Sequence, residues 1–193
     1  MTALELARFA LYADLGLAFG VPAAALLTRA QISPARPVAN GAVLIGLPLS
    51  IIAFLLSVAE MTGTGLADLD WQLAGELAAS TPMGWAFLAR IAALGLAVML
   101  WFALPRRISW QLVLIGVALA SLAWSGHAAA GEGMFALPQL GADIVHLLSA
   151  SIWFGALALF LALLRAGTKV PQESAAALEP SQLDACRHRR SLG

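Results

Sequence analysis

The order of apolar and polar positions divides the chain into five long apolar stretches joined by short polar connectors. A helix needs about 20 mostly apolar residues to cross a hydrocarbon core of roughly 30 Å, because lipid offers its backbone no hydrogen-bond partners. Connectors rich in proline and glycine, such as Ser33-Pro34-Ala35 and Gly131-Glu132-Gly133, mark the turns. The pattern therefore predicts five membrane-spanning helices, the fourth being the shortest, at residues 6–27, 38–59, 83–104, 109–125 and 142–164.

The composition also indicates that the chain lies in a lipid bilayer. Of the 193 residues, 61% are hydrophobic and 11% are charged, and the mean hydropathy is +0.85. Eleven basic residues (Lys plus Arg) balance eleven acidic ones, so no basic surplus favours nucleic acid. The single cysteine, Cys186, excludes an internal disulfide and a cysteine-based zinc site. These values argue against a soluble enzyme and predict an all-α, polytopic membrane protein, a bundle of about five transmembrane helices.

The distribution of positive charge predicts the orientation in the membrane. Positively charged connectors stay on the cytoplasmic side. The first and third connectors and the segment after the last span carry positive residues, which are Arg29 with Arg36, Arg106 with Arg107, and Arg165 with Lys169. The other two connectors contain no Lys or Arg. We therefore expect the amino terminus outside, a helical bundle over residues 1–168, and a polar, disordered cytoplasmic tail over residues 169–193.

Two charged residues lie well inside the predicted spans. A charge near the centre of a membrane helix costs about 2.5 to 3.5 kcal/mol on insertion scales, so it indicates a specific role. Arg90 and Asp14 lie at comparable depths below the outer face, in the third and first spans. Two interpretations remain open: an Arg90 to Asp14 ion pair that stabilises the bundle, or a role of these residues in an ion path.

Two histidines flank one predicted outer connector. His127 follows the fourth span, His146 lies near the start of the fifth, and Met134 lies between them. Neutral histidine binds copper, nickel and zinc, and methionine thioethers favour reduced copper. Asp143 shares a helix face with His146, where its carboxylate is positioned to accept the ring N–H of a metal-ligating histidine. We expect a metal site here, although two interfacial histidines without a ligand explain the pattern equally well.

The residues of this region resemble a known family. They resemble the copper resistance protein D family most strongly over residues 112–164, and the motif comprises Gly126-His127-Ala128, a glycine-rich loop, Asp143, His146, Ala150, Trp153 and Gly155. Gly84-Trp85 and Leu88-Ala89-Arg90 extend the resemblance to the third span. It implies a multi-pass protein of the bacterial inner membrane that takes up or handles copper ions from the periplasm, beside a small periplasmic copper-binding protein and without catalysing a reaction.

On this chain the resemblance makes His127 and His146, with Met134, the candidate copper ligands, and Asp143 the residue that orients His146. Family members continue with further spans, whereas the apolar pattern here stops at Leu164, so we expect a shortened or frame-shifted member. Two other functions stay open. One is a membrane cytochrome that binds haem b through the two histidines, and the other is a non-transporting assembly or sensor subunit.

Overall fold

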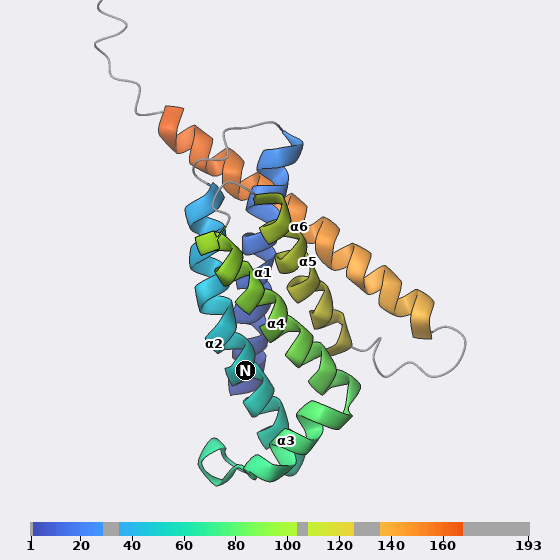
Figure 1. Cartoon of the computed structure of the whole chain (residues 1–193). Helices are drawn as coiled ribbons and strands as arrows, with labels where there is room; N and C mark the ends of the chain where they lie inside the picture. Colours follow the sequence, from blue (N-terminus) through green and yellow to red (C-terminus); the bar gives the residue numbers. More distant parts are fainter. Residues whose placement is uncertain (1, 29–34, 104–107, 126–135, 168–193) are drawn as a thin grey trace, which may run out of the picture. The chain divides into compact units, whose positions relative to one another are not determined.

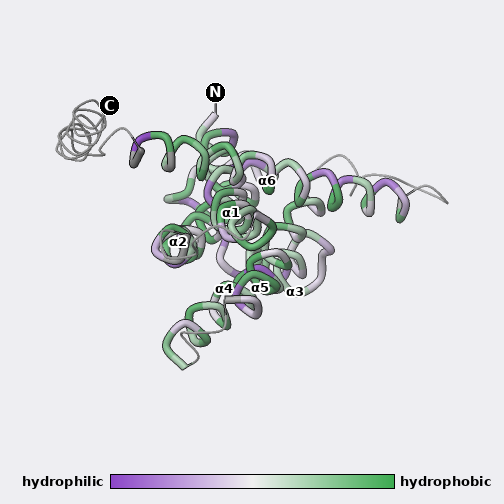
Figure 2. Tube along the Cα trace, turned by 90° about the horizontal axis from the view of Figure 1, so that it is seen from above, coloured by the Kyte–Doolittle hydropathy of each residue, from purple (hydrophilic) through white to green (hydrophobic). Residues whose placement is uncertain are grey.

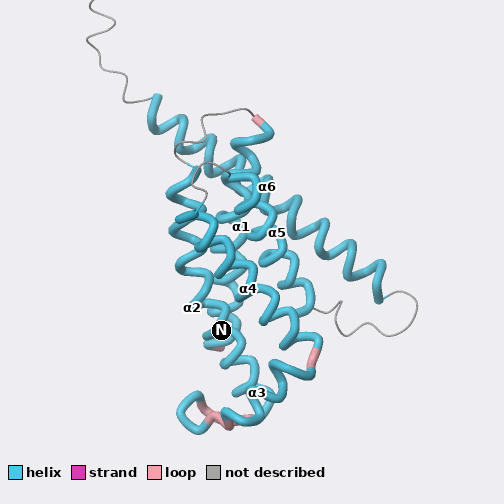
Figure 3. Tube along the Cα trace, viewed as in Figure 1, coloured by secondary structure: helices cyan, strands magenta, loops and turns pink. Residues whose placement is uncertain are grey.

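The structure is a computed structural model that describes residues 2–28, 35–103, 108–125 and 136–167. Most of these residues are helical, and they contain no strand (Figure 1). The described non-helical stretches are short and lie mainly between the second and third helices (Figure 3). The elements are α1 (Ala3–Leu27), α2 (Ala35–Thr62), η1 (Leu66–Asp68), α3 (Trp71–Ser80), α4 (Pro82–Ala103), α5 (Ile108–Ala120), η2 (Ser121–Ser125) and α6 (Ala136–Gly167).

Four helices, α1, α2, α4 and α6, are long and apolar enough to cross a membrane. The fourth predicted span corresponds to α5, which passes into the 3-10 turn η2. This apolar helix, Ser109–Trp124, is shorter and is not among the four, so the structure supports four of the five predicted spans by length. Apolar residues dominate all these helices (Figure 2), and large apolar side chains such as Phe9 and Phe102 are exposed, as a surface that faces lipid requires. The predicted all-α, polytopic membrane protein is confirmed.

The last helix is longer than the sequence pattern predicts. α6 begins at Ala136 rather than at residue 142. Pro138 lies in the first turn of α6, where backbone N–H groups have no partner within the helix. The N–H that proline lacks is therefore not needed there, and the helix can begin before it. With 32 residues, α6 measures about 48 Å at a rise of 1.5 Å per residue.

A short helix that the hydrophobic pattern does not predict lies between the second and third spans. Asp70 caps α3 by accepting hydrogen bonds from the backbone N–H groups of Gln72 and Leu73. One side of α3 packs on the adjoining ends of α2 and α4, in a cluster of Phe54, Val58, Ala59, Leu69 and Ala74. This packing defines one end of the bundle, which we call the α3 end.

The main core lies between α1, α2, α4 and α5. α1 packs against α2 and α5, and α4 packs against the same two helices. Leu11 and Leu15 of α1, Leu94 of α4, and Ile115 and Leu119 of α5 are almost completely buried there. Many of the remaining core positions are alanines, which let the helix backbones approach closely.

α1 and α6 approach each other through small residues. Gly16 and Gly20, one turn apart on α1, face Ser151 and Gly155, one turn apart on α6. A methyl group on either Gly20 or Gly155 would collide with the backbone of the other helix, and one on Gly16 would lie 3.3 Å from the Ser151 Oγ. This is the close approach that pairs of small residues four apart allow in membranes.

The chain divides into residues 1–158 and residues 159–193, and α6 runs through the boundary. The core, the α1 and α6 contact and all the pockets described below belong to the first unit. The described part of the second unit is the end of α6, which carries Arg165 in its last turn.

Candidate ion site

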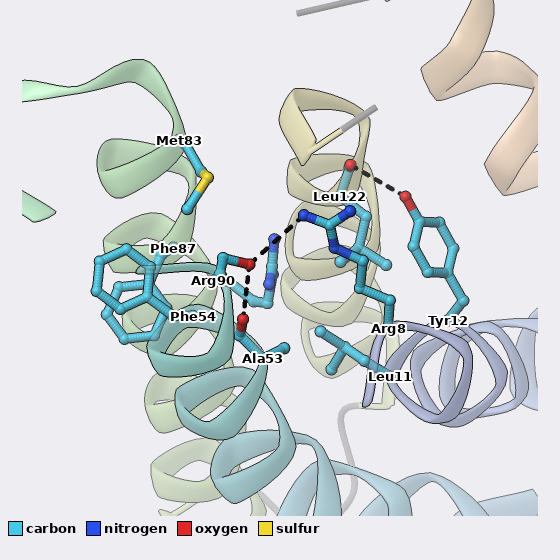
Figure 4. A pocket seen from close by; sticks show the side chains of 10 residues that line it. Arg8, Leu11, Tyr12, Ala53, Phe54, Met83, Phe87, Arg90 and Leu122 are labelled. Carbon is cyan, nitrogen blue, oxygen red and sulfur yellow. Dashed lines mark hydrogen bonds between the residues drawn. The ribbon is translucent and has the colours of Figure 1, made fainter. Parts of the chain in front are cut away.

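A narrow cavity with a partly polar lining lies between α1, α2, α4 and η2, towards the α3 end of the bundle (Figure 4). We call it the arginine pocket, and its polar lining comprises Arg8, Tyr12, Ser57 and Arg90. Its free volume of about 20 Å³ has room for roughly one water molecule. Hydrophobic side chains form the rest of the lining, including Phe54 and Phe87, whose rings stack with centroids 4.3 Å apart.

Arg90 is the most buried charge of the described helices, with only 4% of its surface exposed. It lies eight residues after Pro82, about 12 Å along α4. Its Nε donates a hydrogen bond to the Ser121 Oγ at 2.9 Å, and its Nη2 donates to the Ser121 carbonyl oxygen at 3.4 Å. The Ser121 hydroxyl donates in turn to the Ala118 carbonyl at 2.7 Å. Arg90 thus fastens α4 to η2.

The other polar groups of the pocket come mainly from α1. Arg8 and Tyr12 are one turn apart and therefore share a face of that helix. Arg8 Nη2 donates a long hydrogen bond of 3.5 Å to the Ser57 Oγ, and the Tyr12 hydroxyl donates to the Leu122 carbonyl at 3.2 Å (Figure 4). The Ser57 hydroxyl donates to the Ala53 carbonyl of its own helix at 2.8 Å. These bonds tie α1 to α2 and to η2.

The Arg90 to Asp14 ion pair considered above is not formed. Asp14 lies two residues after Tyr12, about 200° further round α1, so its carboxylate does not reach the arginine pocket. It lies against Gly46 of α2, where an added methyl group would come 2.9 Å from the Oδ2. That oxygen is buried and has no hydrogen-bond partner in the described residues. Arg90 and Asp14 lie at comparable depths along their helices, but they do not pair because their side chains face different neighbours.

The structure describes only part of the expected copper site. His127 and Met134 lie outside the described residues. His146 is exposed and lies about 15 Å along α6 from its start, and Asp143, one turn before it, is partly buried. No hydrogen bond joins these two described side chains. In the part of the chain that the structure describes, no three His, Cys, Asp or Glu side chains form a metal-binding group.

Sequence reasoning missed four polar residues that the fold brings together: Arg8, Tyr12, Ser57 and Ser121. One signal was present, because Tyr12 is the only tyrosine of the chain and lies one turn after an arginine inside a predicted span. The serines carried no such signal. Serine is common in membrane helices, where its hydroxyl bonds to the preceding turn, as both serines also do here.

Comparison with known proteins places this chain in a family. Residues 1–137, which include every residue of the arginine pocket, match the family model described as copper resistance protein D-like, N-terminal domain. Copper resistance protein D of Pseudomonas syringae pv. tomato is 38% identical over 173 residues, covering 82% of this chain and 54% of that protein. The chain thus spans about half the length of this curated relative, and no solved structure matches it. The chain belongs to the copper resistance protein D-like family.

Proposed function

We propose that this membrane protein contributes to copper resistance by taking up or handling copper ions from the periplasm. The match of residues 1–137 to the copper resistance protein D-like family is the observation that carries the proposal. The name of the 38% identical relative supports it. In this proposal copper is the cargo and the protein catalyses no reaction.

The proposed copper ligands are His127 and His146, with Met134 as an additional ligand. The exposed position of His146 supports this assignment, because an exposed imidazole is accessible to an arriving ion. Neutral imidazole and thioether are both ligands that copper accepts. In this proposal Asp143, one turn from His146, accepts the second ring N–H once the metal orients the imidazole.

The arginine pocket limits where copper can pass. Arg8 and Arg90 both line it, and neither forms a salt bridge within the described residues. Their charges repel a copper ion in surroundings of low dielectric constant, where electrostatic interactions are strong. We therefore propose that copper does not cross the bundle between α1, α2 and α4. We keep Asp14, which lies outside the pocket, as a candidate for the ion path.

The distribution of positive residues supports a location in the bacterial inner membrane with the amino terminus and α3 on the periplasmic side. The acidic residues Glu60, Asp68, Asp70 and Glu76 lie in or beside the connector that contains η1 and α3, and all four are exposed. A negative surface raises the local concentration of cations. The proposed partner on this side is a small periplasmic copper-binding protein.

The experiment is copper accumulation in cells that express the chain. We expect the double variant His127→Ala, His146→Ala to accumulate no more copper than cells without the protein. The matched control is His188→Ala in the polar tail, for which we expect wild-type accumulation. Wild-type accumulation in the double variant, at equal membrane levels, would contradict the proposal. A Soret band in the purified protein that the double variant loses would instead favour the haem-binding alternative.

A further inference from the structure

The arginine pocket holds positive charge without a matching negative charge. Arg90 is 4% exposed and Arg8 is partly buried, and no carboxylate of the described residues forms a salt bridge with either. Glu5 is exposed and accepts from the Thr2 backbone at the start of α1, and Asp14 faces Gly46 of α2. Asp143 of α6, which lies near Tyr12, bonds to neither arginine. Serine and carbonyl oxygens satisfy N–H groups but do not neutralise a charge. Charged groups inside membrane proteins are normally paired, so the two arginines favour a negatively charged ligand in this pocket.

The two guanidinium groups still have N–H groups to donate. A guanidinium carries five N–H donors, and Arg90 uses its Nε and one donor of its Nη2 on Ser121. The Nη1 group of Arg90 has no hydrogen-bond partner among the described side chains and backbone. Arg8 makes a single long bond to Ser57. Both groups point into the same cavity (Figure 4).

We propose that the arginine pocket binds one small inorganic anion, such as chloride, between Arg8 and Arg90. The free volume of about 20 Å³ fits a single ion of about the size of a water molecule and excludes a phosphate headgroup. Charge-assisted hydrogen bonds to the two guanidinium groups hold the anion. Stacked Phe54 and Phe87 shield it on one side and strengthen these interactions by excluding water.

The anion also has a structural consequence. Arg8 lies on α1 and Arg90 lies on α4. The hydrogen bonds of the pocket join these two helices only indirectly, through Ser57 of α2 and through Ser121 and Leu122 of η2. An ion bound by both arginines therefore adds a direct link between α1 and α4. A ligand that binds the folded state alone stabilises it, and the stabilisation grows with the logarithm of the ligand concentration above the Kd. We therefore expect chloride to stabilise the bundle, and this expectation does not depend on copper.

The test uses the full chain purified in detergent without copper. The linewidth of the ³⁵Cl resonance reports exchange of chloride with a protein site. The expected result is a broadened resonance for the wild-type protein, which added bromide, a monatomic anion of similar size, narrows by competition. Broadening should fall to the level of empty micelles in Arg8→Gln and in Arg90→Gln. Replacing chloride by gluconate at equal ionic strength should lower the Tm of the wild-type protein only.

The control is Arg36→Gln, which removes one positive charge at the opposite end of α2 from Ser57 and should broaden the resonance like the wild type. Arg8→Gln decides the outcome if Arg90→Gln does not fold, because it leaves both bonds between Arg90 and Ser121 intact. Absence of broadening in the wild-type protein, or full broadening in Arg8→Gln, would overturn the proposal. Either result leaves the copper accumulation experiment unaffected.

Discussion

Arg90 of α4 donates two hydrogen bonds to one residue, Ser121, at the point where α5 passes into η2. The shorter bond, from Nε to the Ser121 Oγ, measures 2.9 Å. The Ser121 hydroxyl and carbonyl thus bind the buried guanidinium of Arg90, for which Asp14 was one of the expected partners. This places the positive charge beside the cavity between α1, α2 and α4.

We expect Ser121→Ala to destabilise the protein, because it removes the hydroxyl that accepts from the Arg90 Nε. Hydrogen bonds to charged groups contribute about 1.5 to 3 kcal/mol, so the free energy of unfolding should fall by about that amount. Unfolding in mixed micelles monitored by circular dichroism measures it. The control is Ser80→Ala, whose exposed hydroxyl bonds only to Glu76 of its own helix. An equal, small effect of both variants would contradict the role of Ser121.

Asp14→Asn should leave the free energy of unfolding unchanged or increase it. The Asp14 Oδ2 is buried without a partner, so an amide there breaks no ion pair. Breaking a buried pair would instead cost about 3 to 5 kcal/mol. The double charge swap Asp14→Arg, Arg90→Asp should likewise fail to rescue the single swaps. Rescue by the double swap would show that these residues form a pair in the membrane.

The close contact between α1 and α6 should not tolerate a side chain. Gly155→Ala places a methyl group against the backbone of Gly20, and overpacking of this kind costs about 1 to 3 kcal/mol. The control is Gly141→Ala on the same helix, where an added methyl group meets no atom within 4 Å. The same unfolding assay should therefore separate the two variants. Similar stability of both would mean that the helices do not pack through Gly20 and Gly155.

Cysteine labelling tests the orientation. In a Cys186→Ser background, Gly65→Cys should react with a membrane-impermeant maleimide in intact spheroplasts, because Gly65 is exposed beside η1 in the connector predicted to be periplasmic. The native Cys186, in the tail predicted to be cytoplasmic, should react only after permeabilisation. Labelling of Cys186 alone in intact spheroplasts would reverse the topology.

The sequence predicts the helices of this protein better than their contacts. Hydrophobic length identifies the membrane spans because lipid imposes it, and the difference at Ala136 arises from a proline that the first turn accepts. The hydrophobic pattern does not predict α3, because this helix has no long apolar run. It is stabilised instead by its Asp70 cap and by the packing of the helix on α2 and α4. The contact of Ser151 and Gly155 with α1 also escapes prediction, because it depends on how two helices cross.

The candidate site shows the same limit. Depth in the membrane follows from position along a helix, so the sequence alone singles out Arg90 and Asp14 as charged residues inside spans. Which neighbour each one faces depends on rotation about the helix axis and on packing. Tyr12 and Asp14 differ by two residues and therefore point to different helices. The copper ligands His127 and Met134, which lie outside the described residues, remain a prediction.

The most direct measurement is the copper content of the detergent-purified chain, determined by plasma mass spectrometry after exposure to copper and removal of unbound metal. The wild-type protein should retain copper in an amount comparable with the protein itself, and the double variant His127→Ala, His146→Ala should retain none above the background of empty micelles. Equal copper in both proteins, or none in the wild type, would contradict the assignment of the two histidines as the copper site.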